Sequence, residues 1–182
     1  MLGQGGILPM EASFIHSSNF LDLKLTGMQG DVMKESMAVA RTVSLKLLTK
    51  AQQNSISKKI KDHNTTGIHI HCPDGATPKD GPSAGTAITI LLYSLLTNKK
   101  VKNNIAITGE MNLQGLVTEI GGLDLKIIGG IEAGVTEFIY PISNQKDFDK
   151  FQEKYKESNI LDNITFHSVI TVKDAMKLIL SK

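Results

Sequence analysis

The chain has 182 residues, a length that suits one folded domain. Hydrophobic residues make up 41% and charged residues 21%, which is typical of a globular protein and excludes an intrinsically disordered one. The 20 Lys and Arg residues nearly balance the 18 Asp and Glu residues, so the charge does not indicate nucleic-acid binding. A single cysteine excludes an internal disulfide framework and favours a reducing compartment.

The sequence shows no pattern of a membrane span or of a secretion signal. The longest apolar run, residues 88–96, is interrupted by polar side chains and is too short to cross a bilayer. Residues 1–6 lack the charged start and the apolar core of a signal peptide. We therefore expect a protein that is not secreted and that does not enter a membrane.

The first third of the chain contains two expected strands and a long helix. Residues 20–26 alternate polar and apolar side chains, as half-buried strands do, and residues 7–16 read as the strand before them. The turn-forming residues 17–19 between them predict a hairpin at a sheet edge. Apolar residues spaced by three and four predict an amphipathic helix over residues 30–51, and the polar segment 52–66 is expected to be a surface connection.

The remainder alternates strands with helices. Strands are expected at residues 67–72, 105–109, 136–141 and 164–170, a short hairpin at 111–121, and helices at 83–97, 122–133, 145–157 and 172–181. Asn144 and Thr171 are predicted helix caps, the latter with Asp174 as its partner, and Gly134 is the predicted end of a helix. This order predicts a single α/β (α+β) domain over residues 1–182, with mixed sheets and flanking helices.

A glycine-rich loop leads into a serine at the start of an apolar helix. Residues 78–85 read PKDGPSAG, and Ser83 would occupy the first helical turn. The first N–H groups of a helix have no partner inside it, so they can stabilise negative charge on an attacked carbonyl. Gly81 allows close backbone approach, and Pro82 fixes the backbone entering the helix. Ser83 as a simple helix cap remains an alternative, and phosphate binding is disfavoured because the GxxxxGK[ST] pattern is absent.

A nucleophilic serine needs a base, and a lysine is the best candidate in this sequence. No GxSxG motif surrounds Ser83, and no histidine stands in an obvious catalytic loop. Lys126 falls in the first turns of the apolar helix 122–133, where the helix dipole and burial both disfavour an ammonium ion. The alternative is a lysine that simply extends from the helix to solvent.

Taken together, these motifs resemble the catalytic domain of the Lon proteases. The matching segments are PKDGPSAG at 78–85, TGE at 108–110 and GGLDLK at 121–126. The 43-residue separation of Ser83 and Lys126 is also similar to the family, and the likeness extends over nearly the whole chain. The resemblance implies the Lon-type proteolytic domain fold and a serine endopeptidase that hydrolyses unfolded or damaged proteins.

The resemblance also implies roles for individual residues. Ser83 would be the nucleophile and Lys126 the general base and later the general acid, with the hydroxyl of Thr108 orienting the lysine. We further expect that Asp80 can pair with Lys126 in a closed form of the loop and hold it protonated. The remaining implied residues are Gly81, Pro82, Ala84 and Glu110 around the dyad, and Met10 and Glu11 on a strand lining the substrate cleft, where a peptide would add as an extended strand. Asp124 and Leu125 depart from the charge pattern of bacterial relatives, so the contacts of Lys126 can differ.

Lon proteases also carry an ATPase module, which this sequence does not resemble. We expect either a fragment of a longer chain, with ATP and Mg²⁺ bound only in the other module, or an ATP-independent relative. The expected partners are polypeptide substrates and further copies of the chain in a hexameric ring, in the cytoplasm or the mitochondrial matrix. A different class of function is a catalytically idle domain for ring assembly or regulation.

Two readings of Cys72 and its neighbours compete with the serine site. His69 and His71 lie on one face of the expected strand and could bind zinc, but Cys72 would point to the opposite face. We therefore expect no metal. A cysteine protease is disfavoured because no helix start follows Cys72.

Overall fold

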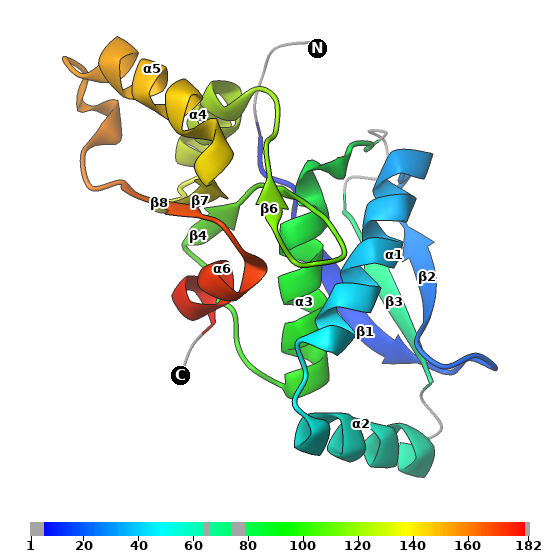
Figure 1. Cartoon of the computed structure of the whole chain (residues 1–182). Helices are drawn as coiled ribbons and strands as arrows, with labels where there is room; N and C mark the ends of the chain where they lie inside the picture. Colours follow the sequence, from blue (N-terminus) through cyan, green and yellow to red (C-terminus); the bar gives the residue numbers. More distant parts are fainter. Residues whose placement is uncertain (1–5, 64–65, 74–78, 181–182) are drawn as a thin grey trace.

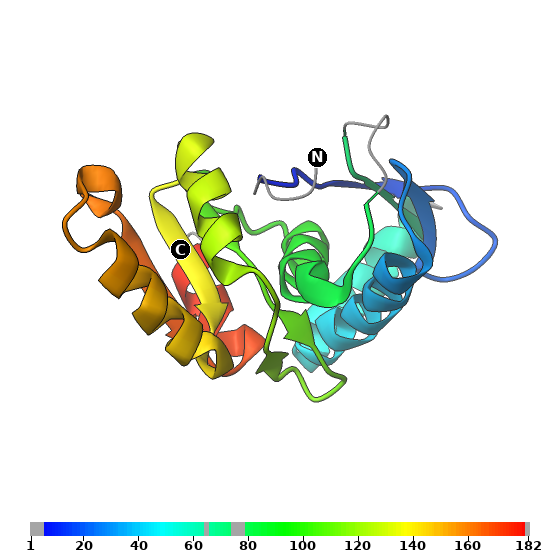
Figure 2. The ribbon, with the colours of Figure 1, turned by 90° about the horizontal axis from the view of Figure 1, so that it is seen from above.

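The computed structural model describes residues 6–63, 66–73 and 79–180. Two three-stranded sheets lie on either side of one central helix, α3 (Figures 1 and 2). No helix in these ranges is long and apolar enough to cross a membrane. The predicted mixture of sheets and flanking helices is confirmed.

The strands are β1 (Glu11–Ile15), β2 (Asp22–Thr26), β3 (Gly67–His71), β4 (Ile105–Ile107), β5 (Glu110–Met111), β6 (Val117–Thr118), β7 (Glu137–Pro141) and β8 (Thr165–Val169). The helices are α1 (Asp31–Lys46), α2 (Lys50–His63), α3 (Gly85–Thr97), α4 (Leu123–Glu132), α5 (Gln145–Tyr155) and α6 (Val172–Ile179). Three short 3-10 turns are η1 (Pro82–Ala84), η2 (Ile142–Asn144) and η3 (Asn159–Leu161).

The first sheet has the strand order β1-β3-β2, so the predicted hairpin of the first two strands is wrong. β3 lies between them, antiparallel to β1 and parallel to β2. The physical reason is burial. Ile68 and Ile70 of β3 are 1% and 0% exposed, and the central position of a sheet is the one that buries a strand most fully. Period-two alternation identifies a strand but does not identify its neighbour.

Residues 50–63 form helix α2, so the predicted surface connection over 52–66 is also wrong for the part that the structure describes. Two isoleucines, Ile56 and Ile60, are four residues apart and are both buried. They share one helical face and join the core formed by α1, α3 and the first sheet. Because only these two residues form the apolar face and the rest of the segment is polar, the sequence pattern did not indicate a helix.

The second sheet has the order β4-β7-β8 and is entirely parallel. Aromatic side chains of β7, β8 and α5 pack together beneath α4, with Phe138, Phe148 and Phe166 at the centre. The short hairpin is confirmed as β5 and β6, which pair antiparallel on either side of Gly115. The central member of the sheet, β7, is buried along most of its length.

Two of the three predicted helix ends are confirmed. Thr171 and Asp174 form a capping box at the start of α6, and Gly134 follows α4 with a φ of 86°. Residue 181 of the predicted last helix lies outside the described residues. Asn144 does not cap α5 with its side chain, which instead bonds to the backbone of Ile120. Ile120 lies three residues before the start of α4.

Candidate functional site

Ser83 lies in η1, directly before α3, and is half-buried. The predicted helix over residues 83–97 is present as η1 followed by α3. Gly81 precedes the turn with φ 133° and ψ 153°, a conformation open essentially to glycine alone, and Pro82 occupies the first position of η1. Residues 74–78 of the preceding loop lie outside the described residues.

The chain after β4 fixes the serine from a second direction. Gly109 N–H donates to the Ser83 carbonyl at 2.8 Å, and the Thr108 hydroxyl donates to the same carbonyl at 3.4 Å. Gly109 has to be small, because a Cβ there would lie 2.4 Å from Val117 and 2.9 Å from Thr86. The end of a parallel strand therefore holds the backbone of Ser83 in place.

Lys126 reaches Ser83 from α4, in the other half of the molecule. Its Nζ lies 2.9 Å from the Ser83 Oγ, a normal hydrogen-bond distance. Burial lowers the pKa of the Lys126 ammonium below its ordinary value of 10.5. A charged Lys126 donates to the hydroxyl, whereas a neutral Lys126 can accept its proton. The structure thus brings together the two residues that the sequence singled out, at a distance suited to proton transfer.

None of the described hydrogen bonds or ion pairs joins Asp80 to Lys126. Its Oδ1 accepts a hydrogen bond from the Met33 N–H at 2.9 Å and another from the Gly81 N–H at 3.0 Å. Met33 is in the first turn of α1, so Asp80 caps that helix from a distant part of the chain. The expected pairing of Asp80 with Lys126 concerns a closed loop, which this conformation does not represent.

The segment before α1 is hydrogen-bonded to the residue that precedes Asp80. Gly30 N–H donates to the Lys79 carbonyl at 2.7 Å, and Lys79 N–H donates to the Met28 carbonyl at 2.9 Å. A Cβ on Gly30 would lie 2.3 Å from the Asp80 Cγ, although its φ of −73° suits any residue. Gly30 is therefore small for steric reasons. The sequence did not indicate this role, because a glycine before a helix has several ordinary explanations.

The remaining predicted residues lie on several different elements and differ in burial. Ala84 ends η1 and packs against the first core. Glu110 is exposed at the start of β5. Met10 is partly buried against the first core, whereas Glu11 is exposed at the start of β1. Thr108 bonds to the Ser83 carbonyl, and none of the described hydrogen bonds joins it to Lys126.

The alternatives around Cys72 are not favoured by the geometry. His69 Nε2 and His71 Nδ1 both hydrogen-bond to the Thr26 hydroxyl, at 2.9 and 2.8 Å. Cys72 is fully buried, and this burial raises the pKa of its thiol, which opposes formation of a nucleophilic thiolate. Within the described ranges, no group of three or more His, Cys, Asp or Glu side chains could hold a metal ion.

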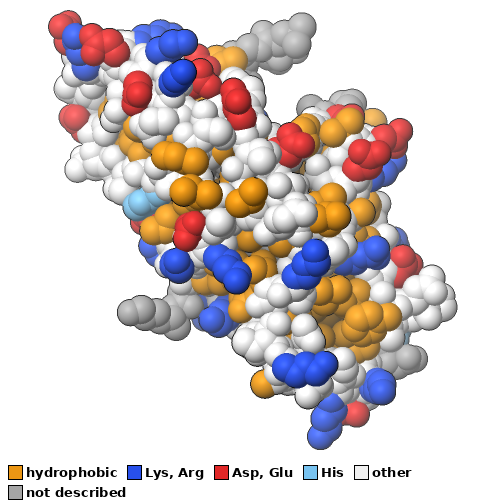
Figure 3. Space-filling view, viewed as in Figure 1, with side chains coloured by type: hydrophobic (Ala, Val, Ile, Leu, Met, Phe, Trp, Pro, Cys, Tyr) orange, Lys and Arg blue, Asp and Glu red, His pale blue; other side chains and the backbone are white. Residues whose placement is uncertain are grey.

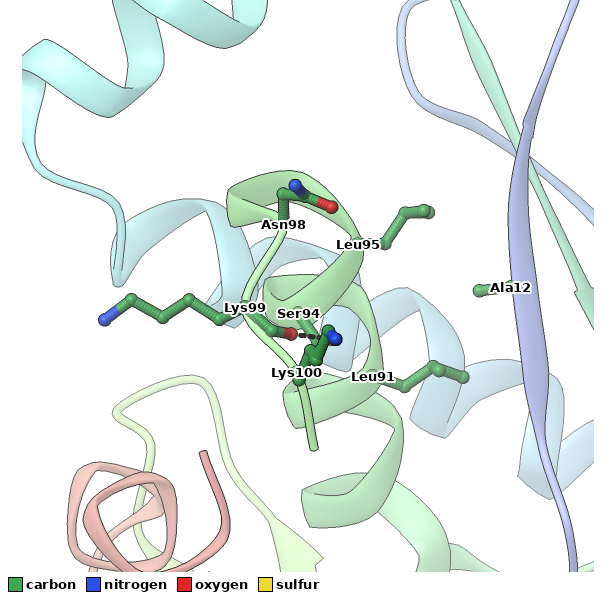
Figure 4. Close-up of a pocket in the computed structure, with 7 residues that line it drawn as sticks. All are labelled: Ala12, Leu91, Ser94, Leu95, Asn98, Lys99 and Lys100. Atoms are coloured by element: carbon green, nitrogen blue, oxygen red, sulfur yellow. Dashed lines mark hydrogen bonds between the residues drawn. The ribbon is translucent and has the colours of Figure 1, made fainter. Parts of the chain in front are cut away.

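A cavity of about 290 Å³ lies between β1 and the far end of α3 (Figure 4). Its lining consists of Ala12, Leu91, Ser94, Leu95, Asn98, Lys99 and Lys100. Leu91 is eight residues beyond Ser83, which corresponds to roughly 12 Å along a helix. The cavity is therefore separate from the dyad.

Comparison with known proteins gives a consistent result. The family model of the Lon protease (S16) C-terminal proteolytic domain matches residues 2–182. Similar proteins include the Lon protease of Borrelia duttonii, 44% identical over 86% of this chain and 18% of that protein, and the Lon protease of Fusobacterium nucleatum, 43% identical over 88% and 20%. The mitochondrial Lon protease homolog of Drosophila melanogaster is 41% identical over 86% of this chain and 14% of that protein. The chain thus spans a fifth or less of the length of these relatives.

Proposed function

Because the chain belongs to the Lon protease (S16) C-terminal proteolytic domain family, we propose that it is the peptidase part of a larger serine protease, with Ser83 and Lys126 as its catalytic dyad. The observation that carries the proposal is the 2.9 Å separation of Nζ and Oγ across two halves of the molecule. A serine and a lysine that meet at a half-buried helix start, with the lysine pKa lowered by burial, form a nucleophile and its base.

The proposed chemistry is acyl transfer in two steps. Neutral Lys126 takes the proton of the Ser83 hydroxyl as Oγ attacks the peptide carbonyl carbon, and the resulting ammonium then protonates the departing amine. Water, deprotonated by Lys126, attacks the acyl-serine ester, and the proton returns to Oγ as the acid product leaves. The N–H groups of Ser83 and Ala84 in η1 are the proposed donors to the oxyanion, because Pro82 has no N–H and the Gly85 and Thr86 N–H groups donate to the Pro82 and Gly109 carbonyls.

The proposed substrate is an extended polypeptide. β1 is an edge strand of the first sheet among the described residues. Ala12 of β1, and Met10 just before the strand, pack against the core that contains α3. An edge strand presents unpaired N–H and C=O groups that an added strand can use. We propose that substrate binds there, with Glu11, the first residue of β1, near one end of the bound segment.

The wider assembly is also part of the proposal. The relatives are five or more times longer than the matched segment, which leaves room for an ATPase module that would bind ATP and Mg²⁺. We propose a hexameric ring located in the cytoplasm or the mitochondrial matrix, with no nucleic acid or membrane as partner of this domain. The assembled dyad favours an active peptidase over an idle assembly domain.

A fluorogenic peptide assay with three proteins tests the proposal. Ser83→Ala and Lys126→Ala are each expected to lower kcat/KM by at least about a thousandfold, because each removes one half of the dyad. The wild-type rate should rise with pH as Lys126 loses its proton, with a midpoint below 10.5. If all three proteins, tested both alone and joined to an ATPase module, hydrolyse the peptide at the same background rate, the domain is not a peptidase.

A further inference from the structure

A buried amide outside the dyad makes the contacts of a structural clamp. Asn144, the last residue of η2, is 0% exposed. Its Oδ1 accepts from the Ile120 N–H at 3.0 Å, and its Nδ2 donates to the Ile120 carbonyl at 2.8 Å and to the Asp147 carboxylate at 2.9 Å. Both backbone groups of one residue are thus satisfied by one side chain, much as a neighbouring strand would satisfy them.

The clamped residue lies at the entrance to the helix that presents the lysine. Ile120 is followed by Gly121 and by Gly122, the N-cap of α4, which has a φ of 67° and makes no side-chain cap bond. Lys126 N–H donates to the Gly122 carbonyl at 3.1 Å in the first turn of the helix. Two glycines give this entrance little stiffness of its own, so its position depends on contacts from outside the helix.

The clamp and the support of Ser83 come from adjacent strands. β4 and β7 are parallel neighbours, so their carboxyl ends meet at the same edge of the sheet. The residues after β4, Thr108 and Gly109, bond to the Ser83 carbonyl. The residues after β7 lead within one 3-10 turn to Asn144. One sheet edge therefore supports both partners of the dyad.

We propose that Asn144 is a positioning residue that, through Ile120, sets how deeply Lys126 is held beside Ser83. For its effect on hydrolysis this inference rests on the proposed function. For its effect on the lysine itself it does not, because the environment of Lys126 can be measured in a protein that hydrolyses nothing.

The position of Lys126 determines its contact with water. Burial is what lowers the pKa of Lys126. The carboxylate of Asp80, ahead of η1, is bonded to the α1 backbone, and Glu110 on β5 and Asp124 on α4 are exposed. A looser entrance to α4 would admit water to the amine, and the pKa of Lys126 would rise toward its ordinary value.

An NMR titration of the Lys126 side chain tests this directly. The Cε resonance is followed in protein labelled with ¹³C-lysine and is assigned by its loss in Lys126→Arg. In Asn144→Ala the pKa of Lys126 is expected to rise by roughly half to one pH unit. The pH midpoint of peptide hydrolysis should move upward by the same amount, in addition to a lower rate.

The matched control is an asparagine at the opposite end of the same strand pair. Asn104 Nδ2 donates to the Thr136 hydroxyl and to the Glu137 carboxylate, both at 3.1 Å, just before β4 and β7 begin. Asn104→Ala should lower the melting temperature and leave the pKa of Lys126 unchanged. An unchanged pKa in folded Asn144→Ala, or an equal shift in Asn104→Ala, overturns the inference.

A milder variant decides the matter if Asn144→Ala does not fold. Asp147 is exposed and orients the Asn144 amide, so Asp147→Ala should loosen the clamp partially. Removal of a negative charge by itself would lower the pKa of Lys126, so an upward shift can arise only from greater hydration. An unchanged or lower pKa then counts against the role of Asn144. Absence of hydrolysis by the wild type would instead contradict the proposed function and leave this titration valid.

Discussion

At the scale of single residues, the proposed dyad of Ser83 and Lys126 is held in place by residues to which no catalytic step is assigned. Ser83 is held by the backbone of Gly109, and the turn before it is held by Asp80 at the start of α1. The Asp80 carboxylate satisfies the Met33 N–H, one of the first-turn donors that a helix leaves without an internal partner. The contact joins the end of the loop before Ser83 to the first half of the core.

Removal of this contact should impair catalysis more than stability. Asp80→Ala is expected to lower kcat/KM roughly tenfold to a hundredfold, because the serine turn loses its anchor. It should cost about 1 kcal/mol of unfolding free energy, as for other lost helix caps. Gly30→Ala should act in the same direction, since its Cβ would occupy the space of the Asp80 side chain. Peptide hydrolysis and urea unfolding measure the two effects.

Asp31→Ala is the control for this prediction. Asp31 is also in the first turn of α1, but its side chain is 96% exposed and pairs only with Lys34 among the described ion pairs. It contributes to the same helix dipole without touching the loop. Equal losses of activity in Asp31→Ala and Asp80→Ala would show that charge near the helix, and not the anchor, is responsible.

At the scale of elements, α4 carries Lys126 and also packs on the second sheet. Gly130 faces the ring of Phe138 on β7, and a Cβ there would lie 2.5 Å from the ring Cε1. Leu123 and Ile127 on the same helix are buried at 3% and 1% exposure. The helix therefore packs close to the sheet, and this close approach is possible because residue 130 has no side chain.

Gly130→Ala is expected to push α4 away from β7 and to destabilise the fold by about 1–2 kcal/mol. Alanine is the better helix former by up to about 1 kcal/mol, so this loss is a net value after that gain. Gly121→Ala is the matched control, because a Cβ at that position meets nothing within 4 Å. Chemical denaturation of both variants measures the difference. Equal stabilities would contradict the close packing of α4.

At the scale of the whole molecule, two halves with separate sheets meet at α3, and the dyad spans the junction (Figures 1 and 2). Acidic and basic side chains both occur on the face seen in Figure 3, with hydrophobic side chains exposed between them. Folding of both halves is required before Lys126 is buried.

The burial of Lys126 links stability to pH. Its pKa is lowered in the folded state, so between that value and 10.5 the unfolded chain binds more protons than the folded one. The unfolding free energy contributed by this residue therefore rises with pH across that interval. Lys126→Met should melt at a higher temperature than wild type near pH 7, and the difference should shrink as the pH approaches 10.5. Calorimetry from pH 6 to 10 checks this, and a difference that grows with pH would contradict it.

Local patterns located most of the elements, whereas the roles expected of Ser83 and Lys126 came from the family resemblance. The alternation in β2, the helical spacing in α1 and the capping box of Thr171 depend on neighbours in the chain, so they are visible in the sequence. The start of an apolar helix made Ser83 and Lys126 candidates, but by itself it also fits a helix cap and a lysine that extends to solvent.

Tertiary structure decided what no local pattern contains. β3 is central because its side chains are the ones that the core buries. Helix α2 could be recognised only from the structure, in which Ile56 and Ile60 are buried in the core. The contacts of Asp80 with Met33 and of Asn144 with Ile120 join residues 47 and 24 positions apart, through a side chain on one side and backbone on the other. Any residue has a backbone N–H, so the partner of such a contact leaves no mark in the sequence and is chosen only when the chain folds.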